Sequence, residues 1–262
     1  MPRIKIFNAQ EIAAFESPPV FNSVERKKFF TLPAPLQKLS QSFYTSTNQV
    51  CFIVMAGYFR ARHQFFGKQF RPADVDFVAT RLALDGVALR SYHKQTVARH
   101  QQMLLEFFGY RRFDEEARRL LRQKMAGLVS AQTKPKVMLL AALEFLQQQR
   151  IALPGYTTLA DLIGNEINRH QRRLIQIVST HLTAAQRQRL DALLEKEATA
   201  QADDPLPQGQ RYRLTLLKKF SQSTKPGRIK GNLADWQLLS TLYGEMESVI
   251  TALGLSHEAL SY

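Results

Sequence analysis

The sequence predicts an all-α protein, and three observations support this fold class. Apolar residues recur at helical spacing along most of the chain, as with Val50, Ile53 and Val54. Residues that favour helix starts, such as Asn22 followed by Glu25, precede several of these stretches. Strand-like alternation is rare, and no Asn-Gly or Asp-Gly hairpin joins two alternating runs. We therefore expect two packed multi-helix regions with helix-turn-helix-like elements and a basic C-terminal extension.

Capping residues, prolines and glycines delimit the helices of the first half of the chain. Asn8 can cap a first short helix, and Pro72 suits the first turn of a later one. Pro33 and Pro35 predict an extended break, because a residue that precedes proline avoids the helical conformation. Gly109 fits the left-handed position after a helix end. The expected helices span about 9–15, 24–30, 47–63, 72–85, 87–92, 96–108 and 114–125.

The second half continues the helical pattern before its composition changes. Helices are expected at about 137–149, from a cap at Thr157 or Thr158 to residue 178, at 183–194 and at 233–253. Between the last two, residues 198–210 are polar and contain two prolines. This composition predicts a linker.

Positive charge is the unusual feature of the composition. Lys and Arg total 36 against 22 Asp and Glu, which makes the formal net charge +14. Residues 48–132 hold 14 basic and 7 acidic side chains, and residues 198–230 hold 7 and 2. Residues 231–262 hold four acids and neither Lys nor Arg. A surplus this large indicates a polyanionic partner, with nucleic acid ahead of an anionic membrane surface.

Several functional classes are excluded or disfavoured. The single cysteine, Cys51, excludes an internal disulfide and a cysteine-rich zinc site. No glycine-rich phosphate loop, HExxH or GxSxG motif occurs, so we predict neither an enzyme nor a cofactor. Asp74 and Asp76 point apart on a helix and are interpreted as solvated first-turn acids. The longest apolar run, residues 50–59, is short for a membrane span and no signal peptide is visible, so we expect a cytoplasmic protein without a membrane partner.

Two groups of residues in the first half are candidate nucleic-acid contacts. At the end of the 47–63 helix, a basic group either contacts phosphates or complements the helix macrodipole, and it comprises Arg60, Arg62, His63 and Lys68. Residues 72–108 have a helix-turn-helix-like pattern, and the last helix carries Gln95, Arg99 and Gln102 on one face. Arginine can read guanine and glutamine can read adenine in the major groove. The alternative is a solvated face of an ordinary bundle helix.

A third group lies in residues 211–230, which hold seven basic residues and no acid. Tyr212 and Phe220 are interleaved with the basic residues, and residues 224–231 resemble a flexible loop. This composition suits phosphate contacts, and a solubilising linker is the alternative. The candidate contacts of this group are Lys218, Lys219, Lys225, Arg228 and Lys230.

Five short motifs follow one another along the chain. They are NQVCFIVMAGYFRARHQFF (48–66), FRPADVDFVATRL (70–82), HKQTVARH (93–100), FFGYRRF (107–113) and RIALPGYTTL (150–159). In this order they resemble the N-terminal domain of Tn-three family transposases, the large transposases of replicative transposons. The resemblance covers at least residues 48–195 and implies an all-helical part that binds transposon terminal inverted repeats. It also implies that the family's acidic catalytic triad lies in a domain beyond this chain, so we expect DNA binding without cleavage and without a cofactor.

The resemblance and the charge distribution together predict double-stranded DNA at transposon ends as the partner. We accordingly expect an N-terminal helical DNA-binding domain (1–132), a second helical DNA-binding region (133–197), a basic linker (198–230) and a C-terminal amphipathic helix (231–262). The expected DNA contacts are Arg60, Arg62, Lys68, Lys94, Gln95, Arg99, Gln102, Arg111, Arg112, Arg169, Arg172, Arg173, Lys218, Lys219, Lys225, Arg228 and Lys230.

Other interpretations remain open. A helical protein–protein module is the first of them, since the acidic stretch 233–253 has a possible apolar face made by Trp236, Leu239, Leu242 and Val249. This stretch would allow self-association through the C-terminal part of the intact protein. RNA binding is the second alternative, and an enzymatic role is the weakest.

Overall fold

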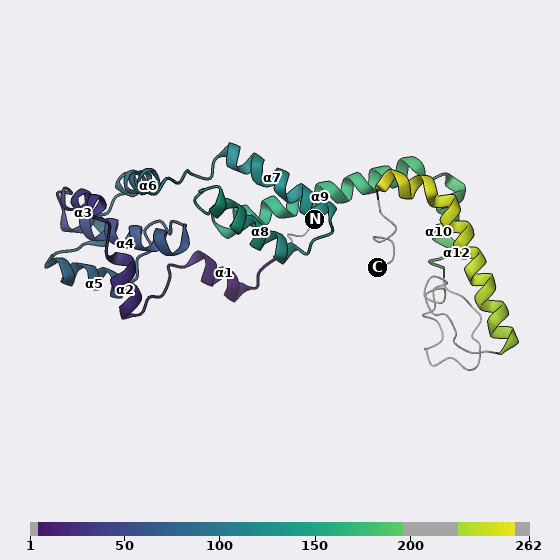
Figure 1. The fold of residues 1–262 in the computed structure, drawn as a ribbon, viewed down its shortest axis with the longest axis horizontal. Helices are drawn as coiled ribbons and strands as arrows, with labels where there is room; N and C mark the ends of the chain where they lie inside the picture. Colours follow the sequence, from purple (N-terminus) through teal and green to yellow (C-terminus); the bar gives the residue numbers. More distant parts are fainter. Residues whose placement is uncertain (1–4, 196–224, 255–262) are drawn as a thin grey trace. The chain divides into compact units, whose positions relative to one another are not determined.

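The computed structural model describes residues 5–195 and 225–254 (Figure 1). These residues form eleven α-helices and one 3-10 turn, with no strand among them, which confirms the all-α fold class for the described chain. They divide into two compact units, residues 1–170 and 171–262. The elements are α1 (Ala9–Glu16), α2 (Ser23–Phe30), α3 (Ala34–Gln41), α4 (Ser46–Arg62), α5 (Pro72–Leu82), the 3-10 turn η1 (Leu89–Ser91), α6 (Lys94–Phe108), α7 (Glu115–Ser130), α8 (Pro135–Gln148), α9 (Tyr156–His181), α10 (Ala184–Ala192) and α12 (Pro226–Leu253).

Capping boxes begin the first two helices where the sequence predicts helix starts. The side-chain oxygen of Asn22 accepts hydrogen bonds from the backbone N–H groups of Val24 and Glu25, each at 2.9 Å. In return, the carboxylate of Glu25 accepts the backbone N–H of Asn22 at 2.9 Å. Asn8 and Glu11 form the same reciprocal pair at the start of α1. Each box satisfies backbone donors that a helix start leaves without partners.

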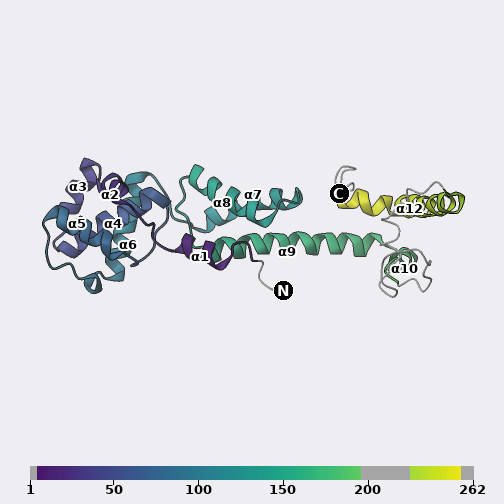
Figure 2. The same ribbon diagram turned by 90° about the horizontal axis from the view of Figure 1, so that it is seen from below.

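α4 lies at the centre of the first core of the N-terminal unit. Helices α2, α3, α5 and α6 pack against it (Figure 2). Side chains on all sides of α4 are buried. α2 approaches α4 closely at Gly57, where an added Cβ would lie 2.4 Å from Cδ1 of Phe30. A helix that is apolar all round is expected in the interior of a domain, and α4 occupies that place.

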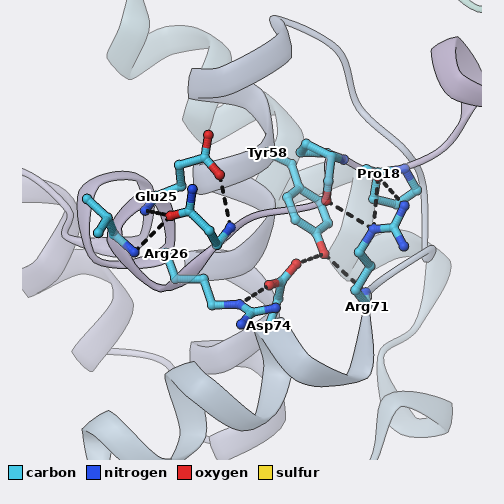
Figure 3. Close-up of polar contacts among 9 residues, drawn as sticks. Pro18, Glu25, Arg26, Tyr58, Arg71 and Asp74 are labelled. Carbon is cyan, nitrogen blue, oxygen red and sulfur yellow. Dashed lines mark hydrogen bonds and ion pairs between the residues drawn. The ribbon is translucent and has the colours of Figure 1, made fainter.

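A buried polar network joins α2, α4 and α5 (Figure 3). Asp74 is completely buried, and its carboxylate accepts hydrogen bonds from Nε of Arg26 at 2.7 Å and from the hydroxyl of Tyr58 at 2.8 Å. The Tyr58 oxygen also accepts the backbone N–H of Arg71 at 3.0 Å. The guanidinium of Arg71 donates to the carbonyl oxygen of Pro18, with its Nη2 at 2.7 Å. The interpretation of Asp74 as a solvated acid was therefore wrong, because partners from other helices make its burial possible.

A second core of the same unit is built from α7, α8, the first part of α9 and residues near α1. Leu121, Met138 and Leu159 are among its fully buried side chains. A small apolar cluster made by Phe59, Leu105 and Ala152 is buried alongside these two cores. Residues 133–170 therefore pack in one unit with the helices before them. The expected separation of residues 1–132 and 133–197 into two DNA-binding regions stays a prediction.

The second unit holds the rest of α9, α10 and α12. Leu193 of α10 and Leu242 of α12 form a small buried cluster, with Leu238 and Leu239 beside it. Nε2 of Gln186 donates to the backbone carbonyl of Glu245 at 2.6 Å. α12 therefore packs on α10 through one apolar face.

Three predicted local structures differ from the observed ones. Pro33 and Pro35 begin α3, since a first helical turn tolerates a residue without an N–H donor. The expected 87–92 helix is reduced to the turn η1, and Tyr92 leaves that turn in an extended conformation with its side chain buried. Residues 226–230, expected in the basic linker, are the first residues of α12, because a proline at the first helical position favours a helix start there.

Candidate nucleic-acid interface

The exposed side of α6 carries four of the predicted contacts. Lys94, Gln95, Arg99 and Gln102 are all exposed, whereas the opposite side of the helix packs into the first core. Gln95, Arg99 and Gln102 are four and three residues apart, which places them on one helix face. The first turn of α6 has no acid. Nε2 of Gln102 donates to the carboxylate of Glu106 at 2.7 Å, so an acid lies only at the far end of this face.

The buried side of α6 is held in place by His100. Its Nδ1 lies 2.7 Å from the hydroxyl oxygen of Tyr92, and its ring stacks on Phe43 with centroids 4.5 Å apart. Burial, assisted by the nearby positive charge of Arg99, lowers the pKa of His100 to about 4. The imidazole is therefore neutral at neutral pH. His100 acts in packing and fixes the direction in which the exposed face of α6 points.

Three loops that each follow a helix end meet at one place, which we call the three-loop junction. They are residues 63–64 after α4, residues 109–112 after α6 and residues 150–153 after α8. Each loop belongs to one of the motifs at 48–66, 107–113 and 150–159. The fold thus brings together three motifs that are far apart in the sequence.

Backbone hydrogen bonds hold the three-loop junction together. The N–H of Arg111 donates to the carbonyl of Arg150, and the N–H of Ala152 donates to the carbonyl of Arg111, both at 2.9 Å. The N–H of Leu153 donates to the carbonyl of His63 at 2.8 Å. Burial lowers the pKa of His63, so its ring also favours the neutral form.

Three arginines surround this junction. Nη1 of Arg111 pairs with the carboxylate of Glu116 at 2.8 Å. Nη2 of Arg112 donates to the carbonyl of Ala98 at 3.2 Å, which places Arg112 beside α6. Arg150 is exposed. It is absent from the sequence-based set, although its position as the first residue of the RIALPGYTTL motif was an available signal.

Arg60 has a structural role within the first core. Its Nη1 donates to the carbonyl oxygens of Phe29 at 2.8 Å and of Thr31 at 2.9 Å. These carbonyls lie at the end of α2, so Arg60 satisfies acceptors that this helix end leaves open. Arg62 and Lys68 are exposed, and the role of all three basic residues in DNA binding stays a prediction.

The predicted arginines of α9 are exposed. Arg169 forms an ion pair with the buried carboxylate of Glu166 at 3.4 Å, one helical turn before it. Arg172 and Arg173 follow on the same helix. Arg172 and Arg173 belong to the second unit, and the part of all three arginines in DNA binding stays a prediction.

The last predicted contacts lie at or before the start of α12. Lys225 precedes the helix as its N-cap, and Lys230 is exposed in its first turns. Lys218 and Lys219 lie outside the described residues, as does the side chain of Arg228. Their part in binding stays a prediction.

In residues 5–195 and 225–254, no group of three or more His, Cys, Asp or Glu side chains could hold a metal ion. None of the helices described there has the length and hydrophobicity of a membrane span. Cys51 is buried, and burial raises its pKa to about 12, so its thiol stays protonated.

Residues 6–166 match the family described as a domain of unknown function, DUF4158. The chain belongs to the DUF4158 family. The DUF4158 match includes α6 and the three-loop junction, whereas Arg169, Arg172 and Arg173 lie beyond it. No curated protein matches the chain.

Proposed function

We propose that this DUF4158 chain binds double-stranded DNA at transposon terminal inverted repeats, as the non-catalytic N-terminal part of a transposase. The exposed face of α6 is the observation that supports this function best. Gln95 and Arg99 stand there on a helix whose other side is fixed by buried His100. The DUF4158 domain is commonly found in Tn-three family transposases, which supports the transposase context.

In this proposal the exposed face of α6 enters the major groove, while α4 packs against the helix from the inner side. The major groove has the width of an α-helix, and base edges there offer distinct patterns of donors and acceptors. Arg99 would bond a guanine through two N–H groups, and Gln95 would bond an adenine through its amide. A rigid helix suits such reading, because a displaced side chain loses the paired geometry.

Arg112 and Arg150 supply phosphate contacts beside that helix. Arg112 lies against α6 through its bond to Ala98, and Arg150 is exposed at the three-loop junction. Phosphate contacts carry no sequence information, but they set the register of the protein on the duplex. The surplus of basic residues in 48–132 supports this electrostatic part of the binding.

Fluorescence anisotropy with terminal-repeat DNA and a scrambled duplex of the same composition tests the proposal. If six to ten phosphates are contacted, affinity should fall roughly a thousandfold or more between 50 and 200 mM salt. The terminal-repeat duplex should remain the tighter ligand at every salt concentration. Equal affinity for the two duplexes throughout would refute specific recognition.

A second function, self-association through the C-terminal part, is favoured by one observation on α12. Ile229, Leu233 and Trp236 are 54%, 54% and 59% exposed and follow the four-and-three spacing of a helix–helix seam. Light scattering across a dilution series should show a concentration-dependent dimer, and Trp236→Glu should shift it toward monomer. A mass that stays monomeric at all concentrations would contradict this function.

A further inference from the structure

A cavity of about 470 Å³ opens directly beside the exposed face of α6. One wall is α6 itself, through Gln95 and Arg99. The opposite wall comes from the end of α3, the connection to α4 and the first turn of α4, through Ser42, Tyr44 and Asn48. Two residues expected to read DNA bases therefore also line a cavity.

The lining of this cavity changes from apolar at its base to polar at its opening. Phe43, His100 and Met103 are buried or half-buried, and the ring of Phe43 stacks on that of His100. Tyr44 and Arg99 are exposed, and Tyr44 is 100% exposed. No acidic side chain is among the described residues that line the cavity. The cavity therefore has an apolar floor, a polar opening and an arginine without a competing carboxylate. These features suit a flat ligand that is part of a polyanion.

We propose that this cavity accepts one unpaired nucleobase of the bound DNA. The proposal rests on the DNA-binding function of the same face of α6. A nucleobase has apolar faces and polar edges, so its ring would lie against Phe43 and its edge would meet the amide of Asn48. The Tyr44 ring would stack over the entering base. A phosphate alone would need only exposed cations, and it would make no contact with the apolar floor of the cavity.

The energetics allow such a site on DNA that is already distorted or unpaired. Extracting a base from a duplex costs stacking and pairing energy, and this cost is smallest for a base that has no partner. Stacking on a protein aromatic ring recovers part of it. The cavity should therefore favour a duplex that carries a bulged base over the same duplex fully paired.

Fluorescence anisotropy of the full chain with three duplexes of one sequence tests the proposal. The first duplex is fully paired, the second has a single bulged adenine, and the third has an abasic bulge that bends equally but offers no base. We expect the adenine bulge to bind about tenfold more tightly than the other two duplexes, the range that one stacked base provides. Equal binding of the two bulges would assign the preference to DNA flexibility and overturn the proposal, as would equal binding of all three duplexes.

Two variants test whether the preference for the adenine bulge arises in the cavity. Tyr44→Ala removes the exposed ring, and Ser42→Trp fills the opening from the same wall. Each should abolish the tenfold preference while the affinity for the paired duplex is kept, and Gln123→Ala on the exposed side of α7 should change neither value. A preference that persists in both variants would overturn the proposal. If the unmodified chain binds none of the three duplexes, the DNA-binding function itself is refuted.

Discussion

α4 and α6 are neighbours in one core, but α4 is buried on all sides whereas α6 is buried on one side only. α4 buries 11 of its 17 residues, whereas α6 buries 4 of its 15. α4 is surrounded by α2, α3, α5 and α6, so each of its faces meets another helix. α6 packs through one face and leaves Gln95 and Arg99 outside. Substitutions in and around α4 should therefore change stability, and substitutions on the outer face of α6 should change binding.

Breaking the polar network around α4 should have the largest effect. Asp74→Asn removes the charge that Arg26 and Tyr58 contact, and should lower the free energy of unfolding by about 3 to 4 kcal/mol. Urea denaturation measures this change. Asp76→Asn is the matched control, because Asp76 is exposed on the same helix and should change stability by less than about 0.5 kcal/mol. Equal losses in the two variants would contradict the role of the network.

Acid should weaken the attachment of α6 to α4 through His100. The pKa of His100 is about 4, against 6.5 for an unperturbed histidine, so the unfolded chain takes up the proton first as the pH falls. This contribution to stability is present above about pH 6.5 and is lost progressively toward pH 4. The stability difference between wild type and His100→Gln should shrink by about 2 to 3 kcal/mol over that range. A difference that does not depend on pH would show that His100 titrates normally.

Filling the closest approach between α2 and α4 should have a smaller effect. Gly57→Ala puts a methyl group 2.4 Å from the Phe30 ring, and the forced movement should cost about 2 kcal/mol. Gly127→Ala in α7 is the control, since nothing lies within 4 Å of its added Cβ. That control should be stabilised by up to about 1 kcal/mol, because alanine is the better helix former. A melting temperature that falls for Gly57→Ala and rises for Gly127→Ala would support the close packing of α2 on α4.

Removing the cation of α6 should leave stability unchanged and reduce DNA affinity. Arg99→Ala should keep the free energy of unfolding within about 0.5 kcal/mol of wild type, since Arg99 is exposed. Its affinity for terminal-repeat DNA should fall about tenfold, while scrambled DNA is bound with little change. Arg119→Ala, an exposed arginine of α7, controls for the loss of one positive charge and should affect both duplexes alike. An equal loss on both duplexes with Arg99→Ala would make this residue a phosphate contact.

Most helices follow from local sequence signals. Asn8 starts α1 and the Asn22–Glu25 pair starts α2 as expected, Pro72 begins α5, and Gly109 ends α6 in the left-handed conformation. These positions are predictable because a cap, a proline or a glycine acts on the backbone within one turn. The break predicted at Pro33 and Pro35 was wrong, because prolines suit both a break and a helix start, and here they begin α3.

The candidate interface is only partly visible in the sequence. The periodicity of α6 places Gln95, Arg99 and Gln102 on one face, and the structure exposes that face. The cavity beside Tyr44 could not be foreseen from local spacing, since it depends on segments that meet only in the folded chain. Arg150 could have been selected from its place in the RIALPGYTTL motif, but its position at the three-loop junction depends on tertiary contacts. Arg60 shows the opposite case, because a residue selected for its charge caps a neighbouring helix.

The sequence by itself determined the all-α class, most helix boundaries and the uneven distribution of positive charge. These properties depend on residues within a few positions of one another. Tertiary structure alone decided that Asp74 is buried, that three distant motifs meet at one junction and that α6 stands beside a cavity. Each of these requires contacts between separate helices, and such contacts follow from packing the whole core.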